Sequence, residues 1–174
     1  MIRSTFLSLI ILAGGIVSFA QTDRPKVPYV DRGACPFECC TYREWGVVKP
    51  TILRRDMNDT SPIVARLKTG EKVRGMTGVV ITTTPGIVQA IKRTTIGNVR
   101  VNPGDRVYVL TNMGEGFAKV WFKGRVRDGE PYDESIFKPI RRSKSVWWVK
   151  IKDRRGRIGW SRLPENFDNV DQCG

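Results

Sequence analysis

The chain has 174 residues and a formal net charge of +13 at pH 7, from 30 Lys and Arg against 17 Asp and Glu. It contains no histidine, which excludes Ser-His-Asp and Cys-His catalysis and the usual general base at neutral pH. The charge excess predicts salt-sensitive attraction to polyanions. The alternative is a basic solvated surface that aids solubility only.

The first 20 residues have the pattern of a cleavable secretory signal peptide. Arg3 supplies the positive start, an apolar run follows from Phe6 to Val17, and Ser18–Ala20 provide small residues for cleavage. A membrane anchor is the alternative, but the run is shorter than the ~20 residues of a spanning helix. We therefore expect a secreted or periplasmic protein that begins at Gln21 and does not span a membrane after cleavage.

Residues 21–44 are predicted to form an extended, cysteine-containing lead-in segment. Three cysteines cluster here and the fourth lies next to the end of the chain: Cys35, Cys39, Cys40 and Cys173. An exported chain favours two disulfides. Because adjacent cysteines pair poorly, we favour Cys35 with one of the neighbouring pair and Cys173 with the other. A four-thiolate zinc site is the competing interpretation, although the usual two separated pairs are absent.

From Trp45 the sequence changes to short β-type runs bounded by Gly, Pro, Asn and Asp. Apolar residues alternate with polar ones in Arg106–Thr111, Phe117–Lys123 and Val146–Lys152, as in half-buried strands. No helical pattern exceeds a turn or two. The prediction is an all-β region over 45–165, followed by a tail, 166–174, that carries Cys173.

The β region contains a weak internal repeat. Leu67–Val73 and Val101–Val107 share an apolar residue, a turn glycine followed by an acid, a base and a valine. The region is therefore predicted to be one expanded barrel or two tandem lobes, over about 45–92 and 93–165.

A family resemblance rests on three segments. Trp147–Ser161 resembles the closing hairpin of bacterial SH3-like domains, in which a Trp-rich strand, a polar turn with Gly and a Gly-Trp pair follow in order. Ser61–Val73 and Pro103–Leu110 resemble the early strands of the same domain. The resemblance implies small five-stranded barrels that bind cell-wall peptide or glycan, or a protein partner.

Alternation places Trp147, with Trp160, in the core, and Trp148 and Trp121 on outer faces among basic side chains. Aromatic rings among ammonium and guanidinium groups suit a glycan or an anionic polymer. Packing under another segment is the alternative for both outer rings. The candidate ligand-binding residues are Lys119, Trp121, Lys123, Trp148, Lys150, Lys152, Arg154, Arg155 and Arg157.

These features predict a non-catalytic binding module with no cofactor, no metal and no catalytic residues. Its expected partner is a cell-envelope polymer, such as peptidoglycan or an anionic glycan, or an envelope protein, whereas export argues against nucleic acid. The alternatives are a disulfide-stapled structural or inhibitory protein without polymer affinity, and an enzyme that uses a carboxylate pair.

Overall fold

The computed structural model describes residues 23–173. The predicted signal peptide lies outside the described residues. Strands account for nearly all of the regular structure in the described chain, and its one helical segment is the single-turn 3-10 helix η1 (Pro164–Asn166). The all-β prediction is therefore confirmed. No helix within the described range is long and apolar enough to cross a membrane.

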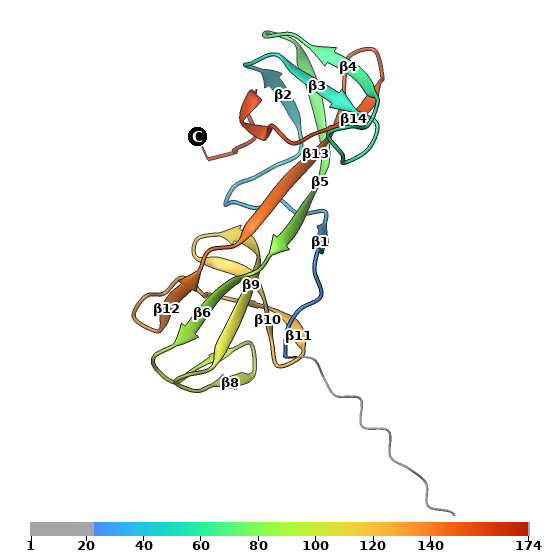
Figure 1. Cartoon of the computed structure of the whole chain (residues 1–174). Coiled ribbons are helices and arrows are strands. Elements are labelled where there is room, and N and C mark those ends of the chain that lie inside the picture. Colours follow the sequence, from blue (N-terminus) through green and yellow to red (C-terminus); the bar gives the residue numbers. More distant parts are fainter. Residues whose placement is uncertain (1–22, 174) are drawn as a thin grey trace, which may run out of the picture.

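The larger sheet of the described chain has eight strands in the order β15-β2-β5-β13-β14-β3-β4, with β1 paired to β5 (Figure 1). All pairs in it are antiparallel, and β13 runs beside β5 over the whole of its own length. Its strands are β1 (Tyr29–Arg32), β2 (Glu44–Val47), β3 (Thr51–Arg54), β4 (Ile63–Leu67), β5 (Lys72–Thr84), β13 (Lys144–Lys152), β14 (Ile158–Ser161) and β15 (Phe167–Asp168).

The second sheet of the described chain has five antiparallel strands in the order β11-β10-β9-β6-β12, and a two-stranded hairpin, β7-β8, accompanies it. The core residues of this part come from both the sheet and the hairpin. The strands are β6 (Gly86–Ala90), β7 (Thr94–Ile96), β8 (Val99–Val101), β9 (Arg106–Gly114), β10 (Phe117–Phe122), β11 (Arg125–Gly129) and β12 (Phe137–Arg141).

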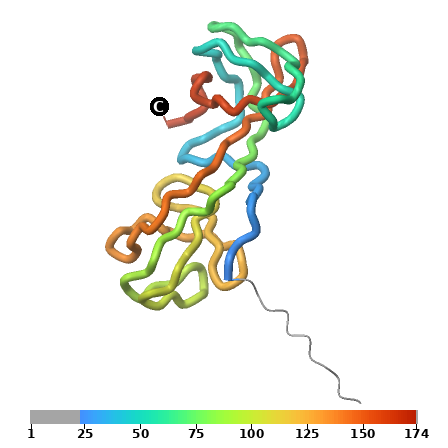
Figure 2. The backbone as a smooth tube through the Cα atoms, viewed as in Figure 1, coloured from blue at the N-terminus to red at the C-terminus, as the bar shows by residue number. Residues whose placement is uncertain are grey.

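Two hydrophobic cores divide the protein into two lobes, which the β5-β13 ribbon joins (Figure 2). The first lobe uses strands from both ends of the larger sheet, which curls into a half-barrel around its core. The second lobe, residues 86–141, is inserted between β5 and β13. This nesting differs from the tandem split near residue 92, because a strand pattern does not say which distant strand completes its sheet.

The two lobes share one strand order. In the first lobe the path is β15-β2-β5-β13-β14, and in the second it is β12-β6-β9-β10-β11. In each case the first and last strands of the lobe lie side by side, and a hairpin follows the first strand: β3-β4 in the first lobe and β7-β8 in the second. The lobes are therefore two versions of one five-strand arrangement.

The repeated turns of the sequence are equivalent in space. Gly70 N–H donates to the carbonyl of Val47 at 2.8 Å, and Gly104 N–H donates to the carbonyl of Ala90 at 2.8 Å. Both glycines have positive φ, at 86° and 93°, a region that glycine enters without steric cost. Each turn thus connects the start of the strand that follows it, β5 or β9, to the first strand of the same lobe, β2 or β6.

The last strands match as well. Phe167 lies opposite Val47 in the first lobe, and Phe137 lies opposite Ala90 in the second. Both phenylalanines are buried in their respective cores. These paired positions fix a residue-by-residue correspondence between the lobes.

Two disulfides hold the N-terminal segment: one lies within it, and the other ties it to the C-terminal tail. Cys35 bonds to Cys40, and Cys39 bonds to Cys173 across a sequence separation of 134 residues. The predicted scheme, in which the neighbouring cysteines take different partners, is confirmed. Since all four sulfurs are in disulfides, they are not available as the thiolates of a zinc site.

Candidate binding sites

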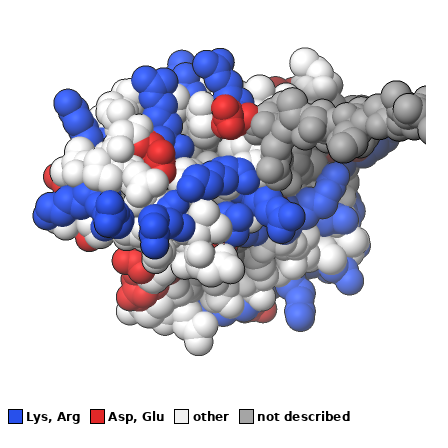
Figure 3. All heavy atoms as spheres, turned by 90° about the horizontal axis from the view of Figure 1, so that it is seen from below, with Lys and Arg blue, Asp and Glu red and all other residues white. Residues whose placement is uncertain are grey.

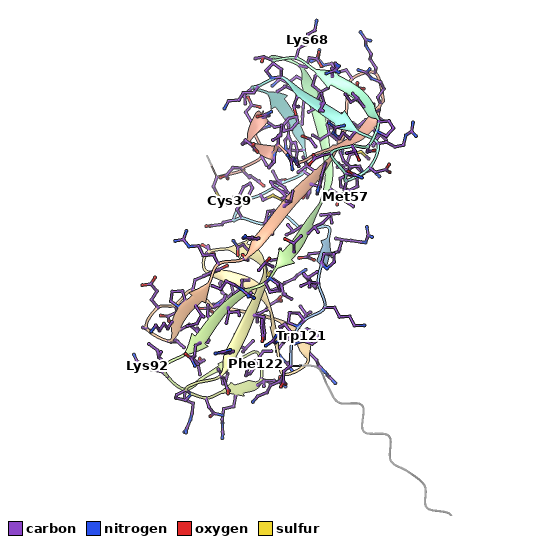
Figure 4. The ribbon with its side chains drawn as sticks, in the orientation of Figure 1. Cys39, Met57, Lys68, Lys92, Trp121 and Phe122 are labelled. Atoms are coloured by element: carbon purple, nitrogen blue, oxygen red, sulfur yellow. A yellow bond between two sulfur atoms is a disulfide. The ribbon has the colours of Figure 1, made fainter. Side chains whose placement is uncertain are left out.

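The predicted ligand residues lie in two separate places. Trp121, Lys119 and Lys123 belong to β10 and its turn in the second lobe, whereas the others belong to the β13-β14 hairpin of the first lobe. Figure 4 shows Trp121 near one end of the molecule and Lys68, next to the hairpin turn, at the other. The structure therefore does not gather the predicted residues into one surface.

The two predicted ligand lysines of the second lobe, Lys119 and Lys123, have partners within the protein. Lys119 Nζ forms an ion pair with Asp31 at 2.7 Å, and the Asp31 side chain is only 7% exposed. Burial lowers the pKa of Lys119 but contact with Asp31 outweighs it, so the pKa is raised. Lys123 Nζ lies 5.0 Å from the ring centre of Phe122 and donates to the carbonyl of Arg100 at 2.9 Å. Both lysines thus have structural contacts.

Trp121 is half-buried, and its indole N–H is buried without a hydrogen-bond partner among the described residues. Its cross-strand neighbours are Tyr108 and Val126. The alternative prediction, that the Trp121 ring packs under other segments, therefore holds for most of the side chain.

Trp148 is on the predicted side of β13, but it is 6% exposed and not an open platform. Trp160, expected in the core, is half-buried instead and shares a groove of about 190 Å³ with Trp148, Ile52 and Leu163. Lys150 Nζ lies 5.6 Å from the ring centre of Trp160. The partly accessible indole of this face is thus Trp160. Alternation gives the face of a side chain, and the neighbouring elements decide whether it is covered.

Trp147, also expected in the core, is half-buried and packs against the first core together with Phe37 and Tyr42. Tyr42 donates a hydrogen bond to the carbonyl of Ala34. Burial raises the pKa of Tyr42 to about 12, although the neighbouring Trp147 indole partly opposes the shift. The lead-in segment therefore supplies the cover that keeps this side of the first lobe from solvent.

A basic surface surrounds the turn of the β13-β14 hairpin. We call it the basic tip, and it consists of Arg66, Lys68, Lys72, Arg74, Lys152, Arg154, Arg155 and Arg157. All but the half-buried Arg157 are exposed, and within residues 23–173 Arg157 alone of this set forms an ion pair. Two grooves run along the tip, with volumes of about 600 and 270 Å³. Three acids, Glu44, Glu71 and Asp153, line them as well.

Sequence reasoning found the half of the basic tip on the hairpin and missed the half on β4 and β5. Those bases come from two alternating runs, in which Arg66 and Arg74 are exposed while Ala65, Leu67 and Val73 are buried. The alternation is visible in the sequence. Only the fold brings these two strands next to the hairpin turn.

Asp153 holds the turn of the basic tip in shape. Its carboxylate accepts the backbone N–H groups of Arg155 and Arg157 at 2.9 and 2.8 Å, and the Arg157 guanidinium donates to it at 2.7 Å. Burial raises the pKa of Asp153, but these hydrogen bonds outweigh it, so the pKa is lowered. The acid is thus engaged inside the turn, and its neighbours Arg154 and Arg155 point to solvent.

Exposed bases also occur at the opposite end of the protein. Figure 3 shows that end with a band of Lys and Arg side chains and few acids. Lys92, Arg93 and Lys138 are exposed in the second lobe. Charge alone therefore does not single out the basic tip, whereas its groove lined by five bases does.

One carboxylate pair is present in the described chain near the cysteines. Glu38 and Glu115 share a hydrogen bond, which raises the pKa of Glu38. Both side chains are exposed, whereas acid catalysts with raised pKa values usually sit in water-excluding pockets. The pair does not resemble a built catalytic site.

Comparison with known proteins gave no match: no family model, no curated protein and no solved structure is significantly similar to the chain.

Proposed function

We propose that this protein is an exported, non-catalytic binding module built from SH3-like barrels, and that its basic tip binds an anionic cell-envelope polymer. The leader-like first 20 residues and the two disulfides support an oxidising compartment outside the cytoplasm. The five-strand path repeated in each lobe supports the SH3-like assignment.

The observation that carries the proposal is the groove of about 600 Å³ beside β4, lined by five bases and two acids. One of those acids, Asp153, is already neutralised by Arg157. An extended polymer with repeated phosphate or carboxylate groups would lie along the groove and meet the guanidinium groups, which bind such anions through paired hydrogen bonds.

The test is retention on purified peptidoglycan sacculi, with and without their covalently attached anionic polymer, at low and raised salt. We expect retention at low salt that requires the anionic polymer and falls as salt rises, because exposed charges are screened. Equal retention on stripped sacculi would show that neutral glycan or peptide is the ligand, and no retention at low salt would overturn the polymer proposal.

A charge-matched pair of variants locates the site. In the first, Lys68→Gln, Arg154→Gln and Arg155→Gln remove three exposed charges from the basic tip. In the control, Lys92→Gln, Arg93→Gln and Lys138→Gln remove three from the second lobe. Exposed ion pairs contribute about 0.2–1 kcal/mol each, so the tip variant should bind about tenfold more weakly. Equal losses of binding in both variants would show that the interaction depends on the net charge of the protein and not on the basic tip.

A further inference from the structure

A cavity of about 430 Å³ opens in the second lobe, between the sheet and the segment that precedes β12. Val88, Val109 and Phe137 form an apolar floor, with exposed fractions of 4% or less. Tyr132 and Pro131 contribute to the wall. The volume falls within the range of about 300–1,000 Å³ that is usual for small-ligand pockets.

The correspondence between the lobes shows what fills this place in the first lobe. Val88 lies opposite Val107, as Trp45 lies opposite Val73. Val109 lies opposite Gly86. In the first lobe the N–H of Gly75 donates to the carbonyl of Arg43 at 2.9 Å, and Arg43 holds the position that corresponds to Gly86. Trp45 and Gly75 are thus the counterparts of Val88 and Val109.

In the first lobe aromatic rings occupy the space. A side-chain carbon added at Gly75 would lie 2.6 Å from atoms of the Trp45 indole, so the ring rests directly on the backbone there. Trp45 also packs against Phe167 at 5.7 Å and Tyr42 at 5.8 Å between ring centres. In the second lobe the indole is replaced by Val88, and the cavity is left beside the equivalent phenylalanine, Phe137.

The rim of the cavity carries an excess of positive charge. Arg141 and Arg142 line it together with a single acid, Glu134. Arg141 donates through Nε and Nη2 to the carbonyl of Pro85, at 3.2 and 2.9 Å, which fixes its position. Arg142 is exposed and forms no ion pair within the described range. A ligand whose ring enters the cavity would therefore find a cation near its outer end.

The far wall offers a polar contact of its own. The Tyr132 hydroxyl donates to Oδ1 of Asn112, and burial raises the pKa of Tyr132, so the phenol remains protonated at neutral pH. This hydrogen bond fixes the Tyr132 side chain in the wall of the cavity.

We propose that the second lobe binds an aromatic ring that carries a carboxylate, with the ring on Val88, Val109 and Phe137 and the carboxylate at Arg142. The bound ring would take the place that Trp45 and its aromatic neighbours hold in the first lobe. This site is independent of the basic tip, which lies in the other lobe.

The test uses 2-naphthoate as the probe and 2-naphthalenemethanol as its neutral counterpart, with binding measured by chemical-shift changes of the cavity methyl groups. We expect both to shift the Val88 and Val109 methyl signals, and Arg142→Gln to weaken naphthoate about fivefold while leaving the alcohol unchanged. Arg93→Gln, which removes an exposed charge of the same lobe away from the cavity lining, should change neither. Absence of shifts at the cavity with either probe would overturn the proposal, and so would equal weakening by both substitutions.

A second variant copies the first lobe. Val88→Trp combined with Val109→Gly recreates the pair formed by Trp45 and Gly75, so the new indole should fill the cavity and abolish naphthoate binding. A cooperative unfolding transition shows whether this variant folds. A folded variant that binds naphthoate as tightly as the wild type would contradict the site, and if it does not fold, the Arg142→Gln comparison decides.

Discussion

The two lobes follow the same strand order, but they are stabilised and exposed in different ways. The core of the first lobe contains the fully buried Trp45 and is covered by the aromatic side chains of Phe37, Tyr42 and Trp147. A disulfide between the lead-in segment and the C-terminal tail closes this lobe. The core of the second lobe contains no tryptophan among the described residues, is covered by the aliphatic side chains of Val99 and Ile136, and borders an open cavity. One backbone arrangement thus supports a closed lobe with charged outer grooves and an open lobe with an apolar pocket, depending on side-chain volume at a few positions.

The largest difference between the lobes should appear when equivalent core residues are shortened. Trp45→Ala removes a ring that is fully buried in the first core, and loss of such a side chain costs about 3–5 kcal/mol of unfolding free energy. Val88→Ala at the equivalent position should cost about 1–2 kcal/mol, because fewer atoms are removed and the site already borders a cavity. Urea unfolding of both variants measures this. Equal losses of unfolding free energy in the two variants would contradict the proposed difference in packing between the two equivalent positions.

The disulfide between Cys39 and Cys173 should matter next. It closes a loop with a separation of 134 residues, and the Cys39→Ser and Cys173→Ser double variant should lose about 2–4 kcal/mol. Amide exchange should quicken more in the first lobe than in the second. The matched control, Cys35→Ser with Cys40→Ser, opens a loop with a separation of only 5 residues, so its loss should be smaller. A larger loss of stability on removal of the Cys35–Cys40 disulfide would show that loop-closure entropy does not determine how much each disulfide stabilises the protein.

The ion pair between Lys119 and Asp31 tests how the lead-in segment holds the second lobe. Because Asp31 is buried, Asp31→Asn leaves a half-buried ammonium without its partner and should cost about 1–2 kcal/mol. Lys119→Met, which removes the ammonium but leaves the buried carboxylate unpaired, should cost a similar amount. Thermal unfolding of both variants and of their combination gives the coupling, and strict additivity would show that the pair contributes nothing.

The smallest effect concerns pH and the basic tip. The lowered pKa of Asp153 means that its hydrogen bonds stabilise the folded state at neutral pH, and this contribution is lost as pH falls through the folded pKa. Asp153→Asn should therefore flatten the acid limb of the stability curve below pH ~4, since the unfolded Asp titrates near that value. Unfolding between pH 2 and 7 measures it. An unchanged acid limb would show that other carboxylates dominate.

Periodicity predicted the strands well where they alternate. Val107 and Val109 in β9, and Val120 and Phe122 in β10, are buried on the expected face. The sequence carries no strand pattern between Gly124 and Ser145, yet this stretch holds β11 and β12, because these exposed edge strands have few alternating apolar residues. In the sequence nothing marked the nesting, since a repeated turn shows that two units exist but not that one interrupts the other.

The candidate sites were less predictable than the fold. Trp148 was placed on the correct face but is buried there, and Trp160 is more exposed than expected. The basic tip includes Arg66 and Lys68, which lie beside the β13-β14 hairpin in space but far from it in sequence. The cavity is present because the small Val88 stands where the first lobe has Trp45. A valine at this position looks like any other core residue in a single sequence.

The pairing of β5 with β13 brings together the two points at which the chain leaves and re-enters the first lobe. Thr84 lies opposite Lys144 at the end of the ladder, so the two ends of the inserted second lobe are neighbours across one pair of strands. A hairpin turn of two residues would span the same gap. The whole second lobe therefore occupies, in topological terms, the tip of a hairpin, and the first lobe tolerates this large insertion because the chain leaves and returns at one point.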